Sequence, residues 1–148
     1  MADWRNELNG ILVGKARVTR AEQENAVFEA FLDTVAFPSL SEVAEELTGK
    51  HGRDAQVRRA PASVTLSVRS GDVEEITFRV MKHFVQSGIL PRAEVRLNRG
   101  QRFLKYECMF KDDPQNYPIT DVTKEEIIAC FIKYYRQVMD QGQAGSQE

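Results

Sequence analysis

The chain has 148 residues, of which 42% are hydrophobic and 28% are charged, and its formal net charge at pH 7 is −2. This length fits one domain with one core, and the near-neutral charge gives no overall bias toward nucleic acid or a membrane surface. The charge is nevertheless segregated. Residues 50–111 hold 13 basic and 6 acidic residues, whereas residues 1–49 hold 4 and 9, and residues 112–148 hold 3 and 7.

The N-terminal segment shows helical periodicity. Four large apolar residues recur there at helical spacing: Trp4, Leu8, Ile11 and Leu12. With Asp3 available as an N-cap and Gly14 as a terminator, the pattern predicts a short amphipathic helix over 3–13, within an N-terminal arm of residues 1–17. A helix of this length has little stability without packing, so we expect its apolar face to lie on the chain's own core or on another subunit.

The main N-terminal helix is predicted to begin after this arm. Thr19 followed by Glu22 has the spacing of a capping box, and apolar periodicity continues to residue 47. Pro38 interrupts this pattern, so either one helix kinks at Pro38 or a second helix begins near Ser39. The glycines and basic residues of 49–52 predict the end of the helical region.

The middle of the chain alternates between apolar and polar residues in four runs. These runs are 64–68, 76–80, 93–97 and 104–110. Turn signals at 70–72 and 98–100, with a looser link at 86–88, join them by connections too short for a parallel crossover. Residues 53–62 are expected to lead into the first strand, and Pro61 indicates either an edge strand or a strand that starts only after it. The pattern predicts a four-stranded antiparallel meander.

A second capping box marks the C-terminal helix. Thr123 and Glu126 have the required spacing, and the helix is predicted to end at Gly142. Its expected core stripe comprises Ile128, Phe131, Ile132, Tyr135 and Met139. Tyr134 falls outside that stripe and is expected at the surface. Residues 142–148 have a polar composition that predicts a disordered tail.

Together these patterns predict an α+β fold. We expect residues 1–141 to form one two-layer domain, in which N-terminal helices and a C-terminal helix pack on one face of the meander. The opposite sheet face is then left exposed. The N-terminus lacks the basic and apolar regions of a secretory signal, and no run of about 18 apolar residues occurs, so a cytoplasmic location is expected.

No spacing typical of catalysis occurs in the chain. His51 and His83 have no carboxylate or nucleophile placed near them by the pattern, so we expect no catalytic residue. Cys108 and Cys130 lie in apolar patterns without metal-ligand spacing and are expected to be buried free thiols in a reducing compartment. No metal and no cofactor are predicted, because the chain also lacks a phosphate-binding glycine loop.

The candidate binding surface is the exposed sheet face. Six basic, aromatic or methionine residues of this face are the predicted binding residues: Arg79, Arg92, Arg96, Lys105, Phe103 and Met109. Segregated charge favours docking between copies, so the leading hypothesis is a small bacterial-type, non-enzymatic module for protein–protein binding or self-assembly.

Two alternatives remain open. The first is single-stranded nucleic-acid binding through the basic sheet face. The second is a small-ligand carrier or an unrecognised enzyme, with a cavity between sheet and helices on which Tyr106, Tyr135 or His83 converge.

Overall fold

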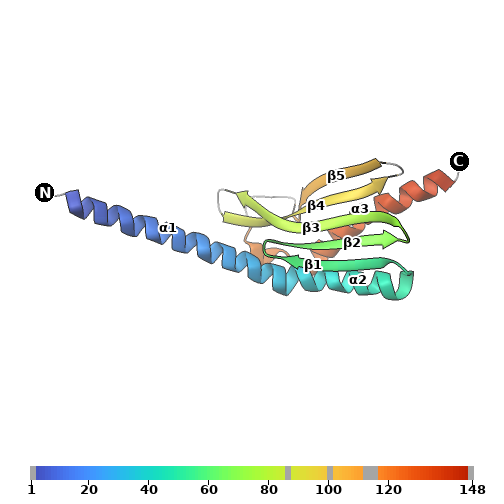
Figure 1. The fold of residues 1–148 in the computed structure, drawn as a ribbon, viewed down its shortest axis with the longest axis horizontal. Helices are drawn as coiled ribbons and strands as arrows, with labels where there is room; N and C mark the ends of the chain where they lie inside the picture. Colours follow the sequence, from blue (N-terminus) through green and yellow to red (C-terminus); the bar gives the residue numbers. More distant parts are fainter. Residues whose placement is uncertain (1–2, 86–87, 100–101, 112–116, 147–148) are drawn as a thin grey trace.

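The computed structural model describes residues 3–85, 88–99, 102–111 and 117–146. These residues form an α+β fold with one antiparallel sheet, in which each strand pairs with the next in the order β1-β2-β3-β4-β5 (Figure 1). The strands are β1 (Asp54–Ala60), β2 (Ser63–Ser70), β3 (Val73–Val85), β4 (Gly88–Arg99) and β5 (Arg102–Met109). The α+β class and the antiparallel meander are therefore confirmed, but the sheet has five strands rather than four.

The additional strand is β1, which replaces the predicted lead-in. It pairs with β2 from Asp54↔Arg69 to Ala60↔Ser63, so that Pro61 lies in the turn, where no ladder hydrogen bond is required. The sequence signal was weak because the covered side of β1 carries only Ala55, Val57 and Arg59.

The N-terminal helices form one continuous helical path. α1 (Asp3–Phe31) passes through a π-helical turn (Leu32–Ala36) into α2 (Phe37–His51). The short helix predicted over 3–13 and the helix start predicted at Thr19 are therefore both wrong. A glycine inside a helix costs only about 1 kcal/mol, so neither Gly10 nor Gly14 needs to end α1 when no proline accompanies it.

Of the two alternatives left open at Pro38, the structure has the continuous helix, with a π-helical turn directly before the proline. Because proline has no amide hydrogen, the carbonyl four residues before it loses its usual partner. In the π-helical turn before the proline, the Phe37 amide donates to the Leu32 carbonyl, and after it the buried Ser39 hydroxyl donates to the Val35 carbonyl at 2.5 Å. α2 then ends as predicted, at Gly52 with φ 66°, whose amide donates to the Leu47 carbonyl.

The core lies between one face of the sheet and the helices. Alternate residues of β2 to β4 are buried on this face, among them Leu66, Phe78 and Val95. α2 packs on β1 and β2, and α3 (Lys124–Ser146) packs on β3 and β4. Among the described residues, no helix covers the other face, as the sequence predicted.

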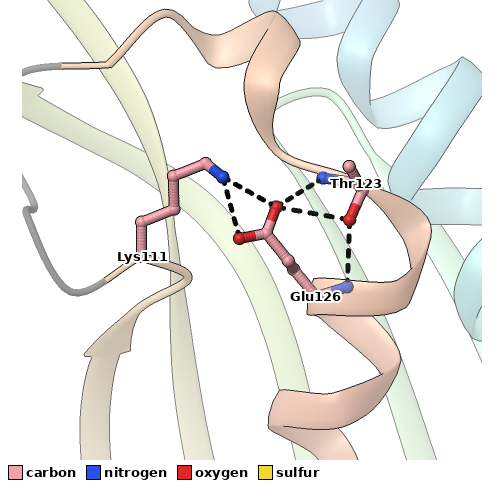
Figure 2. A network of polar contacts seen from close by, with 3 residues as sticks. All are labelled: Lys111, Thr123 and Glu126. Atoms are coloured by element: carbon pink, nitrogen blue, oxygen red, sulfur yellow. Dashed lines mark hydrogen bonds and ion pairs between the residues drawn. The ribbon is translucent and has the colours of Figure 1, made fainter.

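Figure 2 shows the start of α3, where the predicted capping box is present. The Glu126 amide donates to the Thr123 hydroxyl at 3.2 Å, and the Thr123 amide donates to Glu126 Oε1 at 3.0 Å. Lys111 Nζ, at the end of the sheet, lies 2.9 Å from Glu126 Oε2. This network connects the end of the last strand to the start of α3. A short 3-10 helix (Ile119–Asp121) lies just before α3 in the chain.

The buried stripe of α3 differs from the predicted one. Its fully or nearly fully buried residues are Ile127, Phe131, Tyr134 and Val138. The prediction was wrong for Tyr134, which is buried, and for Ile132, which is 46% exposed. The helix also extends past Gly142 to Ser146, so residues 142–146 of the expected tail are helical, and residues 147–148 lie outside the described part of the chain.

Candidate functional site

The N-terminal part of α1 projects away from the body of the protein. In Figure 1 the helix runs past the end of the sheet, and its N-terminus lies far from α2 and α3. The described attachments of α1 to the sheet begin near its C-terminal end, where Lys82 Nζ donates to Asn25 Oδ1 at 2.5 Å. Phe28 is the first fully buried residue among those of α1 whose burial the structure describes. Residues 3–13 are exposed throughout.

This projecting segment carries an apolar stripe that no described residue covers. We define the α1 stripe as Trp4, Leu8, Ile11 and Leu12, whose exposed fractions are 59%, 49%, 66% and 55%. Of the two packings expected for these residues, docking on the chain's own core is therefore wrong. Large apolar side chains gathered in one patch on an exposed surface are typical of interaction sites.

The six predicted binding residues lie together on the open face of the sheet. The register pairs Arg92 with Met109, Arg96 with Lys105 and Asn98 with Phe103, which places the β4 and β5 members side by side. Arg79 lies on β3, two strands away from β5. The structure thus brings the predicted residues onto one surface, and their role in binding remains a prediction.

Most of the basic charge on β4 and β5 is already engaged. Arg92 Nη1 lies 3.4 Å from Glu107 Oε2, and Lys105 Nζ lies 3.4 Å from Glu94 Oε1. The Arg96 guanidinium stacks over the Phe103 ring, 4.2 Å from its centroid. The two ion pairs reduce the positive potential that this half of the face presents to a ligand, whereas Arg96 keeps its positive charge.

The other half of the open face contains a depression that sequence reasoning missed. It has a volume of about 470 Å³. Its lining comes from β1, β2 and β3 and consists of Gln56, Arg58, Ala60, Ser63, Thr65, Ser67, Arg69, Glu74, Thr77 and Arg79. Only Arg79 was predicted as a binding residue, because the strand that supplies Arg58 was not recognised.

The two cysteines form a close pair between β5 and α3. Cys108 Sγ lies 3.1 Å from Cys130 Sγ, and both side chains are half-buried free thiols. The hydrogen bond from Cys130 lowers the pKa of the Cys108 thiol to about 7, against the opposing effect of burial. The hydrogen bond to Cys108, followed by burial, raises the pKa of Cys130. No spacing in the sequence indicated that the two residues meet.

One carboxylate is buried among the core residues. Glu75, 7% exposed, lies at a register irregularity between β2 and β3, which turns its side chain to the covered side of the sheet. Arg53 Nε donates to Glu75 Oε1 at 3.0 Å, and the Tyr135 hydroxyl donates to the same oxygen at 2.7 Å. Burial, followed by this hydrogen bond, raises the pKa of Tyr135 to about 12. The cluster links α3 to the sheet.

The convergence expected for a ligand carrier does not occur. Tyr106 packs against Tyr134, with ring centroids 5.3 Å apart, whereas Tyr135 is bound to Glu75. His83 lies two residues beyond Met81 on the strand, and therefore on the open face. His51 is exposed in the last turn of α2. That part of the carrier hypothesis is wrong.

Within the described residues, no group of three or more His, Cys, Asp or Glu side chains is placed to hold a metal ion. None of the described helices has the length and apolar character needed to cross a membrane. No protein-family model matches the chain, and neither the curated proteins nor the solved structures contain a match to it.

Proposed function

We propose that this protein is a non-enzymatic assembly module that self-associates through the α1 stripe. The observation that carries the proposal is the exposure of four large apolar residues on a helix segment that leaves the body of its own chain. The stripe exposes four large apolar side chains to water, and burial of a side chain of this kind is favourable by roughly 1.5–3 kcal/mol. Packing against a second copy removes the stripe from water and stabilises the segment.

An antiparallel pair suits the position of the apolar residues on α1. Two copies of the α1 stripe meet face to face in a symmetric dimer whose helices run in opposite directions. This arrangement also places the two sheet domains at opposite ends of the pair, since each body is attached to the C-terminal end of its α1 (Figure 1).

Light scattering on the full chain tests this proposal. We expect the wild-type protein to have about twice the 16.9 kDa mass of one chain. The double substitution Leu8→Glu/Ile11→Glu introduces two charges into the stripe and is expected to return the mass to that of one chain. Asn6→Glu/Asn9→Glu is the matched control, because it adds the same charge to the same segment away from the stripe.

Two results would contradict the proposal. One is a wild-type protein that stays at 16.9 kDa across the accessible concentration range. The other is an oligomer that withstands the double substitution in the stripe. Circular dichroism of each variant is expected to show that the sheet domain remains folded, because the substituted segment makes no described contact with it.

The nucleic-acid alternative has less support. A single strand binds through unneutralised basic groups together with aromatic side chains that stack on its bases. Arg92 and Lys105 are paired with carboxylates, and Phe103 is covered by Arg96. Arg79 has no described carboxylate partner, but it lies two strands away from the strand that carries Phe103. An absorption spectrum of the light-scattering peak at low and high salt tests this alternative, because bound nucleic acid is shed as salt increases.

A further inference from the structure

The depression on β1 to β3 is built around one row of three residues. The register pairs Arg58 with Thr65 and Thr65 with Arg79, so the three lie side by side across the sheet. Neighbouring strands are about 4.8 Å apart, which puts the two arginine backbones roughly 10 Å from each other, one on each side of the threonine. Two long cationic side chains thus flank one short hydroxyl on the open face.

Neither arginine is neutralised by a carboxylate among the described residues. Arg58 has no described ion pair or hydrogen bond, and Arg79 Nε has a single long contact of 3.3 Å with the Thr65 hydroxyl. Glu94 lies opposite Arg79 on β4, but its carboxylate is engaged by Lys105. Both guanidinium groups are therefore available to an anion.

The rest of the depression is lined by small polar groups. The side chains that supply hydroxyl or amide groups beside the central row are Gln56, Ser63, Ser67 and Thr77. One carboxylate is present, and Glu74 Oε1 accepts a hydrogen bond from Thr77 at 2.5 Å. Arg69 donates to the Asp72 carbonyl at 3.1 Å. With three arginines and one glutamate, the lining has a net positive charge.

We propose that this depression binds a phosphorylated polyol, with its phosphate held between Arg58 and Arg79 over the Thr65 hydroxyl. The planar guanidinium group matches phosphate oxygens with paired hydrogen bonds. The hydroxyl and amide groups around the row then bind the polyol. A volume of about 470 Å³ falls within the range of small-ligand sites.

Two other occupants fit less well. None of the ten described residues that line the depression is aromatic, so it offers no surface on which a nucleic-acid base can stack. The α1 stripe of a second copy is apolar, whereas nine of the ten residues that line the depression are polar or charged. The lining chemistry therefore favours a small anion with hydroxyl groups. This site is separate from the α1 stripe, so its failure leaves the proposed assembly untouched.

Isothermal titration of the full chain tests the site with four probes: glucose 6-phosphate, inorganic phosphate, glucose and a 20-nucleotide oligothymidine. We expect saturable binding of glucose 6-phosphate, weaker binding of inorganic phosphate and no binding of glucose. Arg58→Gln and Arg79→Gln are each expected to weaken binding of glucose 6-phosphate by about tenfold or more, because each removes a hydrogen bond to a charged group. Arg96→Gln, on the same face outside the depression, is the matched control and is expected to leave binding unchanged.

Several results would overturn the site. Absence of glucose 6-phosphate binding is the simplest. An equal loss in Arg96→Gln would mean that the whole charged face attracts the anion. Equal affinity for inorganic phosphate would remove the role of the polyol, and tighter, salt-dependent binding of the oligonucleotide would favour nucleic acid instead.

Discussion

At the scale of single residues, the cysteine pair is the chemically most distinctive feature. Cys108 and Cys130 come from different elements, and their sulfur atoms are 3.1 Å apart. Sharing of one hydrogen bond between two thiols favours ionisation of one member and opposes ionisation of the other, so the two pKa values move in opposite directions. Cys108 is therefore the thiol that we expect to react with electrophiles.

Removal of Cys130 provides a direct test. In the wild-type protein, the rate of Cys108 alkylation by iodoacetamide is expected to rise with pH around a midpoint of about 7. Cys130→Ala removes the main cause of the lowered pKa and leaves burial, which acts in the opposite direction, so the midpoint is expected to move above 7. Mass spectrometry of the Cys108 peptide measures both profiles.

Cys130→Ser is the control for this experiment. Its hydroxyl retains a hydrogen-bond donor at the same place, so the midpoint is expected to stay below that of Cys130→Ala. Identical midpoints in the wild-type protein and Cys130→Ala would show that the pair does not set the ionisation of Cys108.

The buried Glu75 illustrates a second residue-scale effect. A buried carboxylate is costly unless its oxygens are hydrogen-bonded, and Glu75 has both Arg53 and Tyr135 as donors. The raised pKa of Tyr135 means that the neutral tyrosine is favoured in the folded state. This contribution to stability is fully present below the unfolded-state pKa near 10 and is lost as pH rises through about 12.

At the scale of elements, the start of α3 depends on one hydrogen-bonded network. Partial burial opposes the charged form of Glu126, but Lys111 and the Thr123 amide outweigh it and hold the pKa of Glu126 below its usual value (Figure 2). A carboxyl group with a lowered folded-state pKa stabilises the fold above its unfolded-state pKa. That contribution is lost as pH falls through the lowered value.

Two substitutions test this network by urea unfolding. Thr123→Ala is expected to lower the free energy of unfolding by about 1 kcal/mol, the usual cost of losing an N-cap. Glu126→Gln is expected to be less stable than the wild-type protein at pH 7, and the difference should shrink as pH falls through the lowered pKa of the wild-type carboxyl group.

The neighbouring Glu125→Gln is the matched control, because Glu125 is exposed in the same helical turn. It is expected to show little pH-dependent difference from the wild-type protein. A pH dependence as large as that of Glu126→Gln would assign the effect to the general charge of the first turn rather than to the network.

The sequence predicted elements well where the local signal was strong. The second capping box, the end of α2 and four of the strands follow from side-chain chemistry within a few neighbouring residues. β1 was missed because it has few apolar residues, and α1 was divided because an isolated Gly14 and a capping-box spacing at Thr19 resemble helix ends. Both errors arise where the local signal of a short segment is weaker than the effect of the segments that flank it in the chain.

The candidate sites were less predictable than the fold. The open sheet face could be predicted from the alternation of apolar and polar residues. Which of its basic residues are paired with carboxylates depends on the cross-strand register. Ion pairs such as that of Lys105 with Glu94 join residues eleven positions apart, so the spacing of neighbouring residues does not predict them. The depression required a strand that the sequence signal did not reveal.

At the scale of the whole molecule, the protein combines a packed domain with a projecting helix. The domain buries its apolar residues between the sheet and the helices, whereas α1 carries an uncovered stripe away from it (Figure 1). Because the apolar residues of the domain are buried and those of the stripe are exposed, we propose assembly through α1 and ligand binding on the sheet. The two surfaces lie on different elements, so substitutions in the α1 stripe are expected to leave ligand binding unchanged, and substitutions in the depression are expected to leave assembly unchanged.

The fluorescence emission of Trp4 on dilution tests the central claim most directly. Trp4 is the single tryptophan of the chain and belongs to the α1 stripe, where it is 59% exposed in one copy. We predict blue-shifted emission at high protein concentration and a shift to longer wavelength on dilution, over the same range in which light scattering shows the mass to halve. Emission typical of a water-exposed indole at every concentration, including those at which the protein is an oligomer, would contradict assembly through α1.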